Sequence, residues 1–600
     1  MTPEQFIASK ASEAVKALYG AEAPASIMQV GVTRKDFEGD YTLVVFPLLK
    51  ITHAAPVATA NALGEWLVAN CPEIAAFNAV QGFLNLSLSN LYWKETLEAI
   101  IADRNFGQLP SNGRRVMVEY SSPNTNKPLH LGHVRNNLLG SSVSDLLKAA
   151  GNEVIKTTLV NDRGVHICKS MYAWEQSFNG ATPESTGKKG DHLVGDCYVE
   201  FNNIYSSEVK GLMAGGMDEE TAKKEAPSIK AAHEMLVKWE QNDPEVRKLW
   251  AMMNEWVFAG FDETYKALGI SFDKTYYEHE TYLLGKEIVE KGLETGVLVK
   301  DPDGSVWCDM TADGLDRKLL IRSDGTTVYI TQDLGTAERR FSEYSLDSHV
   351  YVVGDEQNYH FQVLKLILGK LGYKWSDQIF HLSYGMVELP EGKMKSREGT
   401  VVDADDLIEK MYEEAKATSE ESGKLDGLSD EEKDRLYRMI GLGALKYFIL
   451  KVDPKKKMLF NPKESIDFNG NTGPFIQYTH ARICSILRKA ADMGVGSGVP
   501  SGNVGCADTT ELSAKEIRLV KILGSYPQKV AEAAAAFSPA LIANYAYDLA
   551  KEFNQYYHET PILKEPDGDV LHMRLALIST LASVLRKAMG ILGIELPERM

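Results

Sequence analysis

The feature that most constrains the fold is a strand, a turn and a helix that follow one another directly between residues 116 and 151. Residues 116–120 are apolar and typical of a buried strand, and the stretch SSPNTNKP after them is typical of a turn. Apolar residues then recur at helical spacing until Gly151, which ends the helix. The same alternation continues downstream, with expected strands at 154–160, 350–353 and 379–384 and a helix at 361–371. Strands that alternate with helices predict βαβ units and a parallel sheet.

The regions on either side have a different character. Residues 1–110 predict a small α+β domain that ends in the Gly/Pro/Asn-rich linker 104–113, with helices at 3–18, 56–70 and 91–102 and strands at 41–49 and 82–89. Residues 471–600 lack strand signals and predict an all-α bundle, with helices at 476–491, 513–537 (broken at Pro527) and 543–558. We expect the sheet domain to span 111–470, interrupted by a polar, helical insertion at about 180–250.

Charge and cysteine usage narrow the class of protein. Lys and Arg number 65 against 83 Asp and Glu, a net charge of −18, so nucleic acid would be bound only through local basic patches. The six cysteines lie far apart without a CxxC pair, which argues against a disulfide scaffold or a cysteine zinc site and fits a cytoplasmic enzyme. We expect neither a secretory signal nor a membrane span, which needs roughly 18 apolar residues.

The motif His130-Leu131-Gly132-His133 stands at the head of the first helix of the sheet domain. A helix N-terminus presents free N–H groups and a partial positive charge, so it suits an anion. Two imidazoles on this turn can donate to phosphate oxygens, and Gly132 leaves room for a flat base. The alternatives are a chance match and a zinc pair; zinc would need a third ligand, and no HExxH context supplies one.

A second cationic motif, GKMKSREG, lies far downstream. Its Lys393, Lys395 and Arg397 are bracketed by glycines, as in a loop that grips a polyphosphate. Taken alone, a basic surface loop is the commoner explanation, and the motif gains its weight from the pairing with residues 130–133. No Walker A sequence is present, so ATP would be used without a P-loop.

Together the two motifs resemble the HIGH and KMSKS signatures of class I aminoacyl-tRNA synthetases. The blocks EYSSPNTNKPLHLGHVRNN, YITQDLGTAERR, GDEQNYHFQVLK and NTGPFIQYTHARI, with the ending LPERM, resemble bacterial arginyl-tRNA synthetases. The resemblance extends from about residue 25 to the C-terminus and is weakest at 180–250. It implies a Rossmann-type catalytic domain, an N-terminal domain that contacts the tRNA elbow, and a helical anticodon-binding domain.

The resemblance also implies an activity, the ATP-dependent attachment of L-arginine to tRNA(Arg) through an arginyl-adenylate. ATP would enter as a substrate with Mg²⁺, without zinc or an organic cofactor, and the enzyme would be a monomer. KMSKS reads KMKSR here, so Ser396 stands in the place of the second lysine, and Lys127 is the expected substitute. The implied catalytic residues are Lys127, His130, His133 and Lys393, and ATP binding adds Leu131, Gly132, Met394, Lys395, Ser396 and Arg397.

Recognition of arginine requires carboxylates, because a guanidinium offers five donors and keeps its charge. The resemblance places Glu280, Tyr329, Asp333 and Gln357 around the side chain, and Asn124 at the α-amino or carboxyl end. Each of them, considered alone, could be a surface polar residue. A further argument supports Asp333, since it follows the β-rich run TTVYIT, a predicted parallel strand, and ligands gather where such strands end.

Contacts with tRNA are expected on the terminal helices. Phe475, Tyr478 and Arg482 share one helix face, and aromatic rings beside a guanidinium stack well on RNA bases, although such a stripe is more often core. The resemblance adds Met600, and the run 455–457 is either a phosphate contact or a solvated charge run. Three alternatives stay open: a small-molecule nucleotidyltransferase, a synthetase for another amino acid, and a catalytically silent RNA-binding paralogue.

Overall fold

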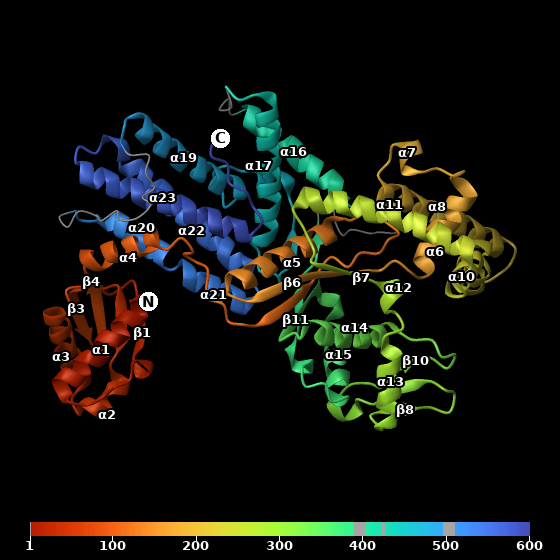
Figure 1. The fold of residues 1–600 in the computed structure, drawn as a ribbon, viewed down its shortest axis with the longest axis horizontal. Helices are drawn as coiled ribbons and strands as arrows, with labels where there is room; N and C mark the ends of the chain where they lie inside the picture. The colour runs from red at the N-terminus through yellow and green to blue at the C-terminus, as the bar shows by residue number, and fades with distance from the viewer. Residues whose placement is uncertain (1, 389–401, 422–426, 496–509) are drawn as a thin grey trace.

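The computed structural model describes residues 2–388, 402–421, 427–495 and 510–600. The molecule is elongated, with the first antiparallel sheet at one end, a parallel sheet in the middle and a group of helices at the other end (Figure 1). The C-terminal helices lie above the first sheet in this view and extend from there to the parallel sheet.

The N-terminal elements form an antiparallel sheet in the order β1-β2-β4-β3. They are α1 (Pro3–Tyr19), β1 (Gln29–Val32), β2 (Tyr41–Val44), α2 (Leu49–Thr52), α3 (Pro56–Asn70), β3 (Ile74–Val80), β4 (Phe83–Leu88) and α4 (Asn90–Ala102). The three expected helices are confirmed. The strand expected over 41–49 ends at Val44, because Pro47 lacks an N–H and lies in a 3₁₀ turn. Strands β1 and β3 escaped prediction, since few of their residues are buried.

The central sheet has five parallel strands in the order β12-β11-β5-β6-β7. They are β5 (Arg115–Glu119), β6 (Glu153–Val160), β7 (Lys274–Tyr277), β11 (Ser348–Gly354) and β12 (Ile379–Tyr384). Helix α5 (Leu131–Ala149) connects β5 with β6, and α15 (Asn358–Lys370) connects β11 with β12. The predicted βαβ units and the Rossmann-type α/β class are therefore confirmed. The strand order reverses between β5 and β11.

The run TTVYIT does not form the expected strand. Helix α14 (Tyr329–Tyr344) begins within it. The β-branched residues of the run favour a strand locally, but Ile330, Leu334 and Phe341 recur at helical spacing and are buried, so packing of this face decides for a helix. Asp333 consequently lies in the first turns of α14 and not at the end of a parallel strand. The neighbouring elements are α12 (Glu278–Thr281), α13 (Gly285–Glu294) and an antiparallel sheet of β8 (Leu298–Lys300), β9 (Val306–Cys308) and β10 (Lys318–Ile321).

The stretch 180–250 is helical, as its composition predicts. With its neighbours it forms α6 (Val165–Ser177), α7 (Pro183–Thr186), α8 (Gly190–Ala214), α9 (Glu219–Glu225), α10 (Pro227–Glu240) and α11 (Pro244–Leu268). These helices pack on one another, with α8 against both α6 and α11. They form the end of the molecule opposite the N-terminal sheet (Figure 1).

The C-terminal part is helical, and the described residues after 459 contain no strand. Its helices are α16 (Ala404–Glu421), α17 (Asp430–Leu450), α18 (Pro462–Ser465), α19 (Gly473–Asp492), α20 (Ala514–Gly524), α21 (Tyr526–Ala536), α22 (Pro539–Glu559) and α23 (Gly568–Ile591). Two short strands, β13 (Val387–Glu388) and β14 (Met458–Leu459), pair with each other. The expected break at Pro527 is confirmed, since α20 ends and α21 begins there.

Helix α23 is long and apolar enough to cross a membrane, judged by length and composition alone, and it is the one such helix in the described ranges. Half of its most apolar window is buried within the protein. It packs against α19 and α22, as the core helix of a bundle does. The absence of a membrane span stays a prediction.

Candidate active site

The carboxyl ends of the parallel strands bring many of the predicted residues to one edge of the sheet. Strand β5 leads into the turn with Asn124 and Lys127, β7 leads into α12 with Glu280, and β11 leads into the turn with Gln357. In open α/β sheets, ligands bind at this edge where the strand order reverses. Here the reversal lies between β5 and β11, and α5 begins directly after the β5 turn.

His130 and His133 cap the N-terminus of α5 with their side chains. The Gly132 N–H donates to His130 Nδ1 at 3.1 Å, and the His130 N–H donates to His133 Nδ1 at 3.2 Å. The two ring centroids are 3.9 Å apart. This is the arrangement of a capping box, with both positions held by histidine. The hydrogen bonds that orient the two rings are therefore local in sequence.

Both imidazoles are neutral hydrogen-bond donors. Burial, with a contribution from Lys127, lowers the pKa of His130 to about 4. Burial also lowers the pKa of His133 well below its usual range, helped by His130 and Lys127. Because each Nδ1 accepts a backbone N–H, hydrogen bonding assigns the proton of each neutral ring to Nε2. Each ring therefore has an Nε2–H that the capping bonds leave for a ligand.

Lys127 lies in the turn between β5 and α5. Burial lowers the pKa of its ammonium from the usual value for lysine. Its charge in turn lowers the pKa of both His130 and His133, so the ammonium lies within electrostatic reach of both rings. The turn thus carries one cation and two neutral donors.

The predicted residues Lys393, Met394, Lys395, Ser396 and Arg397 lie outside the described residues. The chain on either side of them contacts α5 and its turn. On the downstream side the Leu131 N–H donates to the Val402 carbonyl at 3.0 Å, and the Ala404 N–H donates to the Leu129 carbonyl at 2.9 Å. On the upstream side the fully buried Arg135 of α5 donates to the Met386 carbonyl at 3.2 Å. Both flanks therefore reach the helix that begins with the histidine motif.

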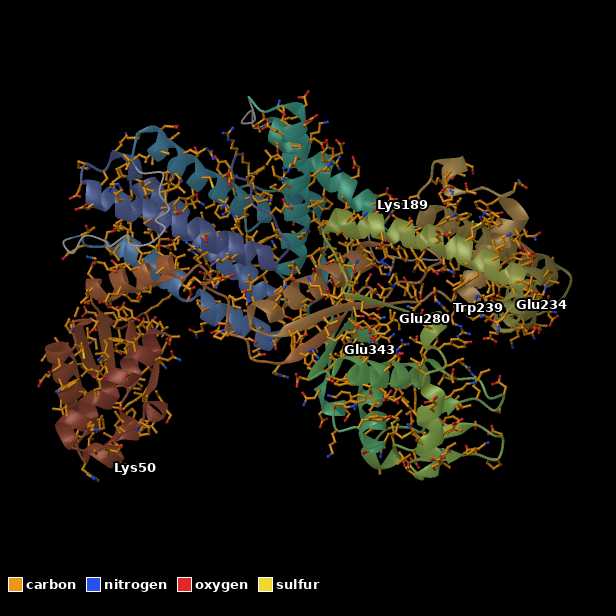
Figure 2. The ribbon with its side chains drawn as sticks, viewed as in Figure 1. Lys50, Lys189, Glu234, Trp239, Glu280 and Glu343 are labelled. Atoms are coloured by element: carbon orange, nitrogen blue, oxygen red, sulfur yellow. The ribbon has the colours of Figure 1, made fainter. Side chains whose placement is uncertain are left out.

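The two acidic residues predicted to bind arginine lie on α12 and α14, which pack together. Asp333 Oδ2 is 2.6 Å from His360 Nε2, and Glu280 Oε1 is 3.9 Å from His279 Nε2. The side chain of Glu280 is 50% exposed, so its carboxylate is open to a solvent-borne cation (Figure 2). The other three predicted residues, Asn124, Tyr329 and Gln357, are exposed.

Sequence reasoning missed several residues that surround these carboxylates. Asp162 lies two residues after the end of β6, is completely buried, and lies 2.5 Å from His279 Nδ1. Burial raises the pKa of Glu278 to about 7, although Arg163, with Nη1 4.0 Å from Glu278 Oε1, lowers it. The signal for Asp162 was present in the sequence, since it follows the predicted strand 154–160, where ligands of parallel sheets gather.

Three of the four residues predicted to contact tRNA line a single pocket of about 400 Å³ on the C-terminal helices. They are Tyr478, Arg482 and Met600. The Arg482 guanidinium lies over the rings of Tyr478 and Tyr557, at 4.8 Å and 5.3 Å from their centroids. The pocket also includes three further cations, Arg488, Lys489 and Arg599. It is therefore a local basic patch on an acidic protein.

Phe475, the fourth of these residues, does not line the pocket. Its half-buried ring lies 5.4 Å from that of Tyr547, between helices α19 and α22. This placement agrees with the core interpretation of the aromatic stripe. The lysines at 455–457 are exposed in the loop before β14.

Comparisons with known proteins decide the family. Residues 96–461 match the catalytic domain of class I tRNA synthetases (R), and residues 476–600 match the DALR anticodon binding domain. The chain is 57% identical over 604 residues to the arginine–tRNA ligase of Bacteroides thetaiotaomicron, with 100% of both chains covered. It is 54% identical over 598 residues to that of Porphyromonas gingivalis, with 99% of both covered.

The chain belongs to the arginine–tRNA ligase family. Solved structures of the same fold include the arginyl-tRNA synthetases of Thermus thermophilus, at a TM-score of 0.76 and 24% identity, and of Plasmodium falciparum, at 0.72 and 19%. Both comparisons cover 100% of each chain. An arginine–tRNA ligase is an ATP-dependent class I synthetase, so ATP, arginine and tRNA are its substrates.

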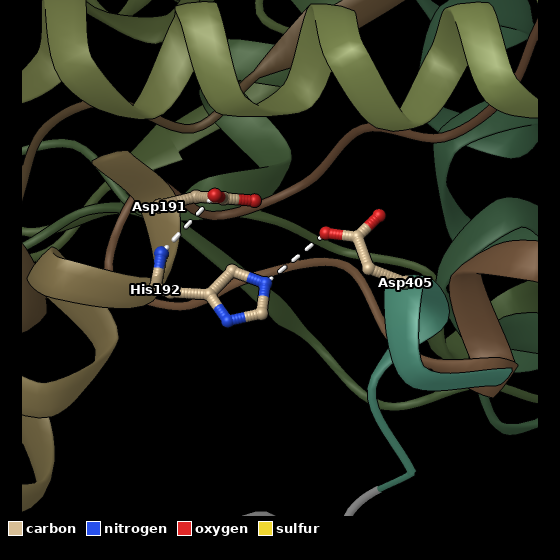
Figure 3. A group of neighbouring side chains, drawn as sticks. All are labelled: Asp191, His192 and Asp405. Carbon is tan, nitrogen blue, oxygen red and sulfur yellow. Dashed lines mark hydrogen bonds and ion pairs between the residues drawn. The ribbon is translucent and has the colours of Figure 1, made fainter. Parts of the chain in front are cut away.

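One polar cluster of this arginine–tRNA ligase lies outside the predicted site. Asp191, His192 and Asp405 bring potential metal ligands within 4.8 Å of one another (Figure 3). Lys189 Nζ, however, is 2.6 Å from Asp405 Oδ2 and 3.3 Å from Asp191 Oδ2. The ammonium already stands between the two carboxylates and balances their charge, so the donor set does not favour a metal ion.

Proposed function

We propose that the site at the carboxyl ends of the parallel strands catalyses the formation of arginyl-adenylate and then the esterification of tRNA(Arg). In the first step a carboxylate oxygen of arginine attacks the α-phosphorus of ATP, and the bond to the β-phosphate oxygen breaks, so pyrophosphate leaves. In the second step a hydroxyl of the 3′-terminal adenosine attacks the arginyl carbonyl, and AMP leaves. Neither step needs a covalent bond to the enzyme, so catalysis rests on orientation and charge stabilisation.

The observation that carries the proposal is the pair of neutral imidazoles at the start of α5. Their Nε2–H groups suit developing negative charge on phosphate, and the positive end of the α5 dipole adds to this field, since the Leu131 and Gly132 N–H groups are themselves bonded to Val402 and His130. Lys127 adds a positive charge beside them, which supports its role in place of the second lysine of the KMSKS signature. We assign ATP binding to Leu131, Gly132 and these residues, together with residues 393–397, and Mg²⁺ enters with ATP as part of the substrate.

For arginine we assign the guanidinium to Asp333 and Glu280, with Tyr329 and Gln357 beside it and Asn124 at the α-amino or carboxyl end. His360 supports the role of Asp333, because a hydrogen bond of 2.6 Å orients its carboxylate. Buried Asp162 holds His279 next to Glu280 in a similar way. Two carboxylates held on two packed elements suit the planar fork of a guanidinium.

For tRNA we assign the anticodon region to the basic pocket with Tyr478, Arg482 and Met600, and leave Phe475 with a packing role. We propose the division expected from the sequence: residues 1–110 contact the tRNA elbow, 111–470 catalyse, with an insertion at about 180–250, and 471–600 bind the anticodon. We further propose a cytoplasmic monomer that needs neither zinc nor an organic cofactor and has no membrane segment.

The test is ATP–pyrophosphate exchange with each of the twenty amino acids, with and without tRNA. We expect exchange with L-arginine in the presence of tRNA(Arg), and charging of tRNA(Arg) in a separate assay. Exchange with another amino acid and none with arginine would contradict the assignment of the carboxylates. Arginine-dependent exchange without any charging would contradict the tRNA contacts.

A further inference from the structure

Helix α8, in the 180–250 region, contacts the turn of residues 127–130, which we propose faces the phosphates of ATP. Lys189, at its N-terminal end, is buried except for 16% of its side chain. Its ammonium donates to Asp405 of α16 and to Thr264 of α11, both at 2.6 Å. His192 on the same helix adds a second link, with Nε2 3.1 Å from Asp405 Oδ2 (Figure 3). Three helices therefore meet at one lysine.

Asp405 is connected to His130 by a short chain of backbone bonds. Asp403 caps α16, since its Oδ1 accepts the Asp405 N–H at 2.8 Å. Asp403 and His130 are partners in an antiparallel bridge. The hydrogen bonds of that bridge join Val402 with Leu131 and Ala404 with Leu129, one on each side of His130. A displacement of Asp405 would therefore move the backbone that carries the His130 ring.

A second contact of α8 reaches the same turn. Gly195 packs so closely on it that an added Cβ would lie 2.8 Å from Pro128 Cδ and 3.7 Å from Lys127 Cα. A proline ring cannot swing away, so this contact needs the missing side chain of glycine. The backbone of α8 thus presses directly on the turn between Lys127 and His130.

We propose that α8 is a positioning element for ATP activation, and that Lys189 and Gly195 are its positioning residues. Lys189 holds residues 402–405 against His130, and Gly195 sets the distance between α8 and the Lys127–Pro128 turn. The inference deepens the proposed function and rests on it, since it concerns the same ATP site. It also assigns a role to the helical region 180–250, because a change in α8 should lower kcat/KM for ATP and leave the KM for arginine unchanged.

The first test compares Lys189→Met with Lys188→Met. Lys188 is the adjacent residue, and its ion pair of 2.6 Å runs to Asp196 of α8 itself, with 56% of the Lys188 side chain exposed. We expect Lys189→Met to lower kcat/KM for ATP in arginine-dependent exchange about tenfold or more, as for loss of a buried charge pair. The KM for arginine and all constants of Lys188→Met should stay within about twofold of the wild type. Equal effects of the two variants, or equal effects on ATP and arginine, would overturn the proposal.

The second test compares Gly195→Ala with Gly211→Ala on the same helix. Nothing lies within 4 Å of a Cβ added at Gly211, so this control carries the same chemical change without the contact. We expect only Gly195→Ala to lower kcat/KM for ATP, with little change in unfolding temperature. A wild-type rate for Gly195→Ala would remove α8 from the positioning of the turn.

The double variant Lys189→Met/Asp405→Asn covers the case in which one variant folds poorly. If the pair acts as a unit, the double variant loses no more activity than the less active single variant, whereas independent effects multiply. Multiplying effects would contradict the link between the two residues. Absence of arginine-dependent exchange in the wild type would instead contradict the proposed function itself, so the two failures are distinguishable.

Discussion

Substitution of His130 by asparagine can separate the structural from the catalytic part of this side chain. In the structure, Nδ1 accepts the Gly132 N–H at 3.1 Å, which assigns the proton of the neutral ring to Nε2. Asparagine is among the best N-cap residues, and its Oδ1 stands near the place of Nδ1. The variant His130→Asn therefore keeps the cap of α5 and removes only the donor proposed to face the phosphates.

The size of the effect follows from that single donor. A hydrogen bond to a charged group contributes about 1.5–3 kcal/mol, which corresponds to a loss of roughly 10- to 150-fold in kcat/KM for ATP. Loss of an N-cap costs a helix about 1 kcal/mol. We therefore expect His130→Ala to lose both activity and thermal stability, and His130→Asn to lose activity alone.

The assay is tRNA-dependent ATP–pyrophosphate exchange, with the unfolding temperature of each variant measured in parallel. A wild-type exchange rate in His130→Asn would show that Nε2–H does not face the phosphates. An unfolding temperature as low in His130→Asn as in His130→Ala would refute the capping argument, because the asparagine oxygen would then have failed to replace Nδ1.

Three further predictions concern the same site. Asp333→Asn should raise the KM for arginine about tenfold or more, through loss of one charged partner of the guanidinium, and leave the KM for ATP unchanged; equal changes in both constants would indicate a structural role. Lys127→Ala should lower single-turnover adenylate formation roughly 10- to 100-fold with an unchanged unfolding curve, and a near-wild-type rate would remove Lys127 from the mechanism. Because burial lowers the pKa of His130 to about 4, its ring should bind no proton between about pH 5.5 and 8, where a free histidine titrates. The NMR chemical shifts of the ring should therefore be constant in that range. The free energy of unfolding should fall as the pH drops from about 6.5 toward 4, because the unfolded chain takes up the proton first. A titration midpoint of the ring near 6.5 would contradict its burial.

Prediction from sequence succeeded where the structure depends on residues that are close to one another in the sequence. The histidine motif follows a strand and a turn, and its two capping bonds join residues at most three positions apart. The same local rule failed at Asp333, because TTVYIT favours a strand in isolation while the buried face of α14 favours a helix. Asp162 could have been found by the strand-end argument, but its partner His279 lies 117 positions away.

The amino-acid sequence by itself determined the parallel sheet, the helix that begins with the two histidines, and the residue types suited to phosphate and to a guanidinium. It determined them because hydrophobic period, turn residues and helix caps act over a few positions. Tertiary structure alone decided which distant segments share the site. Arg135 reaches the carbonyls of Met386 and Lys456, 251 and 321 positions away, and Lys189 reaches Asp405 across 216. Contacts of that separation arise only when the sheet, α8 and α16 pack, and no local pattern specifies which buried charge meets which partner.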